Sequence, residues 1–479
     1  MSIGLVIRNT LYYGIVPKLT VLLSIIMLPL TTPFLTTFDY GIYGVLISYA
    51  VLFMSIAPLG MNVHLTNSFF EYPHRYNIVW GRVLMLILIS SFLFGLLNMG
   101  ILMMTLPLPS FTGKLGLCVL GSMPIFLVAN GFLAQHIFPL TESPKPLVFT
   151  NLAGPVAGMA VSFILIFYFK AGYWGLIASS TVSSIIIFLV FVKYVWKDFN
   201  IWPIWDSNRK RLKNMLRIAL PLVPHTLGFV LLTSSARIVM SQYGVSYDEI
   251  GLFSHGSTMG DYATVITSAL VTALMPQIQR SYRSKNYKEY RNLYFLCQTV
   301  AVITSFVLCI WMPEIYSILI RNARLAQSCD IACMLCFANV VFSFYTFMST
   351  PAFINKDTPQ LLWLVFVPGI LNFAACYILI PFWGYRVAVY STIFFYWSQL
   401  LVPFVVGYYK KSVQEWMGDR RIVGFILLVL FADMVIANEA IHAAVWIKVV
   451  MTLLAVIALY VGVKKRMSKE RKIHDKVLL

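Results

Sequence analysis

Long apolar segments recur along the whole chain, and they constrain its fold more than any other feature. Each is about as long as the ~20 residues that an α-helix needs to cross a bilayer. Because lipid offers the backbone no hydrogen-bond partner, such segments fold as helices. They centre near residues 24, 56, 94, 126, 158, 184, 230, 263, 306, 340, 370, 396, 430 and 453. The sequence therefore predicts an all-α polytopic membrane protein with about 14 transmembrane helices.

The composition excludes an ordinary soluble protein. Hydrophobic residues make up 59% of the 479 residues, charged residues 11%, and the mean hydropathy is +0.80. The first apolar run, from about Leu11 to Leu35, is too long for the apolar part of a signal peptide and lacks a small-residue cleavage site. We expect it to be retained as the first span. No loop is long enough to fold as a domain of its own.

The distribution of charge predicts the orientation of the chain. There are 36 Lys and Arg residues against 18 Asp and Glu, a formal net charge of +18. Most of the basic residues fall in alternate connections, near 75–82, 145, 193–217, 280–291, 356 and 410–421, whereas the other connections hold Lys114, Lys170, Arg321, Arg324 and Arg386. Basic loops stay in the cytoplasm, so both termini are predicted to be cytoplasmic. The basic clusters are expected to lie against anionic lipid headgroups, and nucleic acid is not an expected partner.

Two segments with the same order of features indicate an internal repeat. Pro17-Lys18-Leu19-Thr20 precedes a turn at residues 39–44, and Pro224-His225-Thr226-Leu227 precedes a similar turn at residues 248–253. The separations are 207 and about 209–210 residues, and many transporters are built from such repeats. We therefore expect an N-terminal six-helix lobe over 1–197 and a basic cytoplasmic linker over 198–215. A C-terminal six-helix lobe over 216–412 and two extra helices with a basic tail over 413–479 complete the prediction.

The hairpin of residues 213–291 carries polar groups that a lipid-facing helix avoids. His225, Arg237 and Asp261 are ionisable, and Thr226, Thr233 and Arg237 share one helical face. In the second helix seven polar residues recur at intervals of three or four, namely Ser254, Ser257, Thr258, Asp261, Thr264, Ser268 and Thr272. Two polar stripes predict a lined cavity, although hydroxyl groups also join neighbouring helices. An ionisable group within a span, such as Asp261, is a functional candidate by default.

Other polar groups in the spans have a structural interpretation as well. His64, on a predicted face with Ala57, Gly60 and Ser68, either titrates or hydrogen-bonds to a neighbouring helix, and the second interpretation is favoured. Lys448 is expected to extend towards the outer surface.

The cysteine pattern predicts neither a metal site nor a disulfide framework. Cys329, Cys333 and Cys336 share a helical face that suits a soft metal, but packing between helices is favoured because no histidine completes the set. Most of the seven cysteines fall inside predicted spans. No P-loop, nucleophile elbow, zinc-protease or dinucleotide motif occurs in a usable context. We therefore predict that the chain is not an enzyme and needs no cofactor.

Residues 35–72, LTTFDYGIYGVLISYAVLFMSIAPLGMNVHLTNSFFEY, resemble the first-hairpin signature of bacterial polysaccharide and O-antigen flippases. In that signature a D/E-Y/F-G-x-Y turn is followed by a helix that ends in a glycine and a polar-aromatic exit. Residues 216–243, LRIALPLVPHTLGFVLLTSSARIVMSQY, and residues 249–282 are similar to the seventh and eighth helices of the family. The resemblance covers residues 1–410 in order and spacing. One departure is Ala236, which precedes Arg237 where the family often has an acidic residue, so an Asp–Arg pair is absent there.

This resemblance implies membership in the multidrug/oligosaccharidyl-lipid/polysaccharide (MOP) exporter superfamily, with two six-helix lobes around a central cavity and alternating access. It also implies a protein of the bacterial inner (cytoplasmic) membrane that moves polyprenyl-diphosphate-linked O-antigen, capsule or exopolysaccharide units to the outer leaflet. Cationic groups pair well with phosphate, so Lys18, His225 and Arg237 are the candidates for binding the diphosphate or glycan. Asp261 and His64 are the candidates for ion coupling. Alternatively, Lys18 and Arg237 extend to the membrane surfaces, and Asp261 pairs with Arg237.

Other functions remain open. A lipid II-type flippase fits a fourteen-helix plan, and a drug/cation antiporter of the same superfamily is disfavoured because bases outnumber acids within the spans. A membrane polysaccharide polymerase or ligase is less expected because the outer loops are short. The expected partners are the lipid-linked oligosaccharide, membrane lipids and other polysaccharide-assembly proteins.

Overall fold

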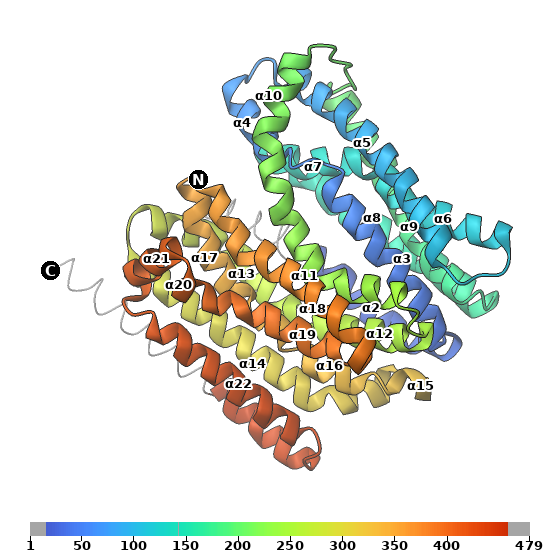
Figure 1. Ribbon diagram of the computed structural model, residues 1–479, viewed down its shortest axis with the longest axis vertical. Coiled ribbons are helices and arrows are strands. Elements are labelled where there is room, and N and C mark those ends of the chain that lie inside the picture. Colours follow the sequence, from blue (N-terminus) through green and yellow to red (C-terminus); the bar gives the residue numbers. More distant parts are fainter. Residues whose placement is uncertain (1–15, 142, 458–479) are drawn as a thin grey trace. The chain divides into compact units, whose positions relative to one another are not determined.

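The computed structural model describes residues 16–141 and 143–457, and Figure 1 shows them as a set of packed helices. Within these residues there is no β-strand. The all-α fold predicted from the apolar segments is therefore confirmed.

Eleven helices of the described part are long and apolar enough to cross a membrane, and two shorter apolar helices, Leu19–Phe34 and Val445–Ile457, accompany them. A further pair, α12 (Tyr247–Asp261) and α13 (Ala263–Arg283), occupies the place of the predicted eighth span. Its polar stripe lowers its hydropathy, so it is not one of the eleven. Helices thus lie at each predicted position, but the count of fourteen spans is approximate.

The chain forms two compact units. Unit 1 contains residues 1–254, 319–326 and 365–388, and unit 2 contains residues 255–318, 327–364 and 389–479. The boundary falls inside α12 and not at the predicted linker of residues 198–215. The division into two sequential six-helix lobes stays a prediction.

Unit 1 is built mainly from the first half of the chain. Its helices are α2 (Val16–Thr31), α3 (Thr37–Ile56), α4 (Asn62–Glu71), α5 (Tyr76–Thr105), α6 (Phe111–Phe126), α7 (Val128–Leu140), α8 (Pro144–Phe163), α9 (Tyr173–Val192), α10 (Arg209–Ala219), α11 (Val223–Gln242), the start of α12, α15 (Ala323–Ala326) and α18 (Val367–Trp383). Short 3₁₀ and π segments join or extend them, namely η2 (Thr32–Phe34), η3 (Ile164–Tyr168), η4 (Lys193–Asp198) and η5 (Leu220–Leu222). Within this unit α8 packs along α9, and α11 packs along both α3 and α18 (Figure 1).

A buried cluster at one end of unit 1 joins α4, α5, α7, α9 and α10. Trp80 of α5 is completely buried there and donates a hydrogen bond from Nε1 to Ser68 Oγ of α4 at 3.1 Å. Met215 and Ala219 bring the buried face of α10 into the same cluster. Burial of aromatic and aliphatic side chains thus fixes the basic helix α10 to the unit.

Unit 2 contains most of the second half of the chain. Its helices are the end of α12, α13, α14 (Tyr287–Leu319), α16 (Cys329–Leu335), α17 (Phe342–Ile354), α19 (Val387–Trp397), α20 (Val402–Val405), α21 (Gly407–Met417), α22 (Arg421–Ala440) and helix Val445–Ile457. The intervening segments are η6 (Ala338–Val341), η7 (Thr358–Gln360), η8 (Leu362–Phe366) and η9 (Ser398–Leu401).

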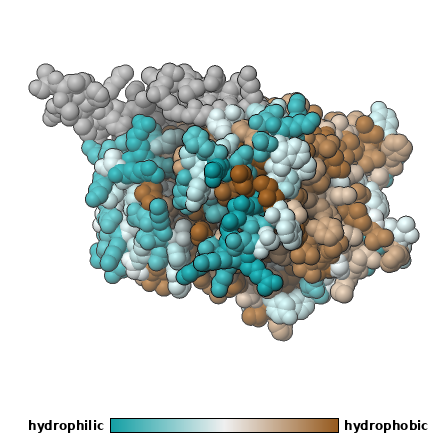
Figure 2. All heavy atoms as spheres, turned by 90° about the horizontal axis from the view of Figure 1, so that it is seen from above, coloured by the Kyte–Doolittle hydropathy of each residue, from teal (hydrophilic) through white to brown (hydrophobic). Residues whose placement is uncertain are grey.

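The surface of the described helices is rich in hydrophobic side chains. Met104, Phe382 and Val405, for example, are 89%, 78% and 80% exposed. Figure 2 shows hydrophobic side chains over much of the face that it presents, with hydrophilic side chains gathered beside them. Exposed apolar surface of this extent is typical of helices that face lipid, so the chain is a multi-pass membrane protein.

Candidate functional site

A capping box begins α3, and related side-chain contacts at the start of α12 support the internal repeat in this part of the chain. Before α3, Thr36 Oγ1 accepts from the Asp39 backbone, and the Asp39 carboxylate accepts from the Thr36 backbone. Before α12, Ser246 Oγ accepts from the Glu249 backbone and also donates to its carboxylate. The two sets of contacts are 210 residues apart, so Asp39 corresponds to Glu249. In both, a hydroxyl accepts from a free N–H group at the helix start.

The second span is interrupted, which changes the predicted surroundings of His64. Helix α3 ends at Ile56, and a turn with positive φ at Leu59 (53°) and Gly60 (69°) leads into α4. The expected continuous face with Ala57, Gly60 and Ser68 is therefore wrong. The turn lies against the end of α10, because a Cβ atom on Gly60 would overlap the carbonyl oxygen of Ala219. His64 is half-buried in the first turn of α4.

The other predicted histidine also lies next to an interruption. The segment η5 separates α10 from α11, and half-buried His225 lies in the first turn of α11. Its ring packs edge-on against Phe229 at a centroid distance of 5.6 Å. Lys18 belongs to α2, but its side chain lies outside the described part, so its proposed equivalence with His225 stays a prediction.

Arg237 lies where α3, α11 and α12 meet in unit 1. Its side chain is half-buried, and Nε donates to Ser254 Oγ at 3.2 Å. The guanidinium carbon lies 5.6 Å from the ring centroid of Phe253, a typical cation–π distance. A Cβ atom on Gly44 would lie 3.5 Å from Arg237 Cδ, so this glycine leaves room for the side chain. The arrangement holds a permanent cation within a transmembrane segment.

Asp261 lies at an interruption in unit 2. It is the last residue of α12, and Tyr262 separates α12 from α13. Its exposed carboxylate accepts a hydrogen bond from Asn339 Nδ2 at 2.8 Å. Asn339 belongs to η6, where the span formed by α16 and α17 is itself interrupted. Two broken helices therefore meet at one carboxylate, and transporters place ion and substrate sites at such helix breaks.

Side chains of neighbouring helices satisfy the carbonyl groups that the break in η6 releases. Ser305 donates to Cys336 O at 3.0 Å, Trp397 to Phe337 O at 2.9 Å, and Gln298 to Val340 O at 3.3 Å. Unpaired backbone groups inside a membrane cost several kcal/mol, on the order of a lost hydrogen bond or more. Two side chains of α14, Ser305 and Gln298, and one of α19, Trp397, therefore support the break.

The predicted polar stripe of α12 and α13 divides into two parts. Ser254 and Ser257 are 5% and 8% exposed, which fits hydroxyl groups that join helices. Thr258, Asp261 and Thr272 are exposed. Because a carboxylate is costly in lipid, the exposed part of the stripe is suited to an aqueous lumen.

Three polar residues of unit 2 differ from the sequence predictions, since two were not singled out and the surroundings of the third were predicted wrongly. Asn339 and His255 were not singled out, although His255 lies within the polar stripe between Ser254 and Ser257 and its spacing was a usable signal. The expectation for Lys448 is wrong: it is 1% exposed, and Nζ lies 2.6 Å from Glu314 Oε1. Its partner is 134 residues away in the sequence, so no local pattern indicated the pair.

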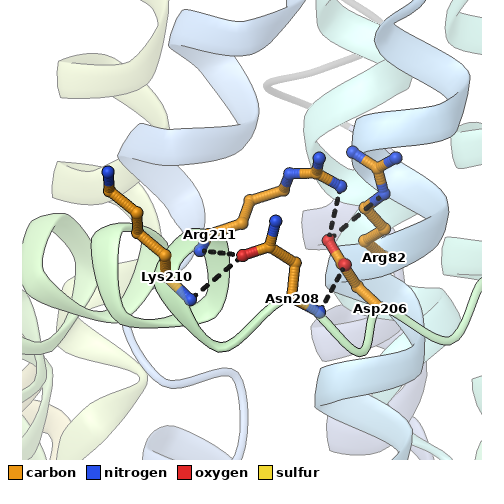
Figure 3. A network of polar contacts seen from close by, with 5 residues as sticks. All are labelled: Arg82, Asp206, Asn208, Lys210 and Arg211. Atoms are coloured by element: carbon orange, nitrogen blue, oxygen red, sulfur yellow. Dashed lines mark hydrogen bonds and ion pairs between the residues drawn. The ribbon is translucent and has the colours of Figure 1, made fainter.

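The basic linker forms a polar network at one end of unit 1 (Figure 3). Asp206 accepts from Arg211 Nη1 at 2.9 Å, and Arg82 Nε of α5 lies 3.4 Å from the same carboxylate. Asn208 caps α10 by accepting from the backbone N–H groups of Lys210 and Arg211, at 3.1 Å each. The backbone N–H of Asn208 lowers the pKa of Asp206 below its ordinary value of 3.8, Arg211 and Arg82 lower it further, and burial opposes them.

The cysteine face of α16 shows no sign of a metal centre in the part of the chain that the structure describes. Cys329, Cys333 and Cys336 are free thiols, and no group of three or more metal-ligand side chains occurs among residues 16–141 and 143–457. Cys333 Sγ lies 3.8 Å from the Cys309 carbonyl oxygen of α14, as expected for packed helices.

Solved structures with the same fold are transporters. An inward-facing multidrug resistance MATE family transporter of the MOP superfamily superimposes with a TM-score of 0.62 at 13% identity, over 85% of this chain and 99% of that chain. An outward-facing multidrug resistance MATE family transporter of the MOP superfamily gives 0.53 at 13% identity, over 85% of this chain and 96% of that chain. A MOP superfamily transporter from Pyrococcus furiosus Vc1, reported with reversed polarity of its binding pocket, gives 0.54 at 13% identity, over 85% and 95%. No curated protein gives a significant match.

The sequence itself matches one family over more than half of its length. The model of the family described as polysaccharide biosynthesis protein matches residues 6–282, a range that includes the first interrupted span, Arg237 and Asp261. The resemblance drawn from the first hairpin and from the seventh and eighth spans is therefore confirmed. The chain belongs to the polysaccharide biosynthesis protein family and has the fold of the MATE transporters of the MOP superfamily.

Proposed function

We propose that the chain is a flippase that moves a polyprenyl-diphosphate-linked oligosaccharide from the inner to the outer leaflet of a bacterial inner membrane by alternating access. The observation that carries the proposal is a polysaccharide-family sequence on a transporter fold. The distribution of basic residues orients the chain with both termini in the cytoplasm. The oligosaccharide is an O-antigen, capsule or exopolysaccharide repeat unit.

The chemistry of Arg237 is suited to binding a lipid-linked substrate with an anionic headgroup. A diphosphate carries several negative charges, and a guanidinium offers donors in a planar fork that matches phosphate oxygens. In unit 1 the group is fixed by Ser254 and Phe253 and stays half-buried. His225, twelve residues earlier on the same helix, supplies a second nitrogen donor when it is protonated.

Coupling is proposed to use an ion gradient or the membrane potential. Asp261 and Asn339 offer a carboxylate and an amide oxygen at two helix breaks, and hard cations prefer such oxygen ligands. His64 is a second candidate for coupling because imidazole titrates near neutral pH.

Export of the surface glycan tests this function. In a strain that lacks the gene, complementation with wild-type protein is expected to restore export, whereas Arg237→Ala is expected to leave lipid-linked oligosaccharide on the inner leaflet at an unchanged protein level. Arg324→Ala is the matched control, because it removes an exposed basic side chain of the short helix α15, at the first turn of its span. Export that is equal for Arg237→Ala and wild type would remove Arg237 from the site.

The exposed carboxylate of Asp261 favours one alternative, a drug or cation antiporter of the MATE type, since an acidic group attracts cationic substrates. This function predicts that loss of the gene sensitises cells to cationic drugs and leaves lipid-linked oligosaccharide unchanged. A lipid II-type flippase instead predicts arrested cell-wall synthesis. The same knockout strain therefore separates the three functions.

A further inference from the structure

A buried histidine in unit 2 is hydrogen-bonded to two hydroxyl groups from other helices. His255 of α12 is 1% exposed, and its Nδ1 atom lies 2.7 Å from Ser328 Oγ. Tyr316 of α14 lies 2.9 Å from the same Oγ atom and 3.5 Å from Nδ1. The imidazole and phenol rings meet edge-on at a centroid distance of 5.7 Å. Ser328 is completely buried as well.

Close packing encloses this cluster. A Cβ atom on Gly256, the next residue of α12, would lie 2.7 Å from Ile331 Cβ and 2.9 Å from Ser328 O. A Cβ atom on Gly260 would lie 3.0 Å from Leu335 Cβ. Residues 328–335 therefore pack directly on α12 and leave His255 almost without contact to solvent.

The hydroxyl groups around the imidazole can form a hydrogen bond with either of its protonation states. A hydroxyl donates to neutral imidazole and accepts from imidazolium, and both Ser328 and Tyr316 supply one.

Both signs of charge occur on the surrounding elements. Asp330 lies on α16, and Glu314 of α14 is paired with Lys448. On α12 itself, Asp261 lies six residues after His255 and is bonded to Asn339.

The position along the helices places the cluster near the predicted outer surface. His255 lies two turns into α12, which starts at Tyr247, and Tyr316 lies three residues before the end of α14. Both of these helix ends face outwards in the orientation that the basic loops predict. A proton from the outer aqueous phase therefore has a short path to the cluster.

We propose that His255, together with Ser328 and Tyr316, is a proton-binding site through which transport is coupled to the proton gradient. This inference rests on the proposed flippase function and names the proton as its coupling ion. A proton from the outer phase forms an N–H bond on the imidazole, and the same bond breaks when the proton is released, so no other reactant is needed. An ionised imidazole is disfavoured in the closed packing. Protonation therefore favours the state in which α12 separates from residues 328–335.

Hydrogen–deuterium exchange of the purified protein in nanodiscs tests the proposal without any substrate. After correction for the intrinsic pH dependence of exchange, wild-type amides in residues 255–261 and 328–335 are expected to exchange about tenfold faster at about pH 5 than at about pH 8. His255→Asn keeps a polar atom near the Nδ1 position but does not titrate, and it is expected to abolish this difference. His255→Gln is the second variant in case the first one does not fold.

Two further variants serve as controls. His136→Gln removes a half-buried histidine of α7 in unit 1 and is expected to leave the response intact. If the pH dependence of exchange persists in His255→Asn, the proposal is overturned. It is also overturned if the pH dependence disappears in Asp261→Asn but not in His255→Asn. Failure of the export assay together with an intact pH response would refute the flippase function and leave the proton site standing.

Discussion

Gly41 and Gly251 each contact the backbone of the other's helix. A Cβ atom on Gly41 would overlap the carbonyl oxygen of Tyr247 in α12, and a Cβ atom on Gly251 would overlap that of Thr37 in α3. The two glycines are separated by 210 residues, as are Thr37 and Tyr247. The contact is therefore reciprocal between equivalent positions of the repeat. Thr37 Oγ1 also donates to the Asp248 carboxylate beside this crossing.

Alanine at Gly41 or at Gly251 is expected to force α3 and α12 apart. The overlapping atoms belong to the backbone, which cannot rotate away as a flexible side chain would. Overpacking of this kind costs about 1–3 kcal/mol, so we expect lower thermal stability in detergent and reduced export. Gly100→Ala in α5 is the control, because no atom lies within 4 Å of its Cβ position. Equal melting temperatures for Gly41→Ala and Gly100→Ala would contradict the prediction.

Asp261→Asn is expected to reduce export several-fold while it preserves the fold. The amide can keep a hydrogen bond to Asn339, but the negative charge that would attract a coupling cation is lost. In the double variant Asp261→Asn/Asn339→Asp the charge returns to the same pair of helix breaks, and partial recovery is expected.

Export measured with protein levels matched by immunoblot decides this prediction. Thr264→Ala is the control, because it removes a hydroxyl bonded to the Asp261 carbonyl oxygen without changing charge. If Asp261→Asn exports as well as wild type, the carboxylate has no part in coupling.

The linker network is expected to give a small contribution to stability that depends on pH. The pKa of Asp206 is lowered in the folded protein. Its contribution is therefore present above the ordinary value of 3.8 and is lost as the pH falls through the lower value of the folded state. Since the carboxylate is partly exposed, with 16% of the side chain accessible, the effect is expected to stay below about 1 kcal/mol. Thermal melts of wild type and Asp206→Asn are expected to differ at pH 7 and to converge at strongly acidic pH. High salt is expected to reduce the difference, and a difference that grows in acid would refute the prediction.

The sequence predicted the helices well because each span is a local property. Hydropathy over one segment identifies a span whatever it packs against, and the repeat was visible because its turns are local as well. The turns at residues 39–44 and 248–253 were matched in this way, although the correspondence of Asp39 with Glu249 required the contacts at the two helix starts.

The details of the site depend on contacts between distant residues. The break in η6 lies in an apolar stretch that gives no sequence signal, and its support comes from Gln298, Ser305 and Trp397 on other segments. The turn at Leu59 and Gly60 likewise interrupts a stretch that was expected to be one continuous helix. A hydropathy profile detects a span. It does not detect the point in the span at which backbone carbonyl groups lose their helical N–H partners and accept from side chains instead.

Lys448→Met is expected to destabilise the attachment of helix Val445–Ile457 to α14. The substitution leaves the Glu314 carboxylate without its cation, and an uncompensated buried charge is costly. Because 29% of the Glu314 side chain is exposed, the cost is expected to be about 1–3 kcal/mol and not the full value of a completely buried pair. The double variant Lys448→Met/Glu314→Gln removes both charges and is expected to recover most of the loss. Trp311 Nε1 still donates to Thr452 Oγ1 in both variants, so thermal melts compare the same helix contact with and without an unpaired charge. If the double variant melts as early as the single one, then packing of the lysine stem holds the helix and the ion pair does not.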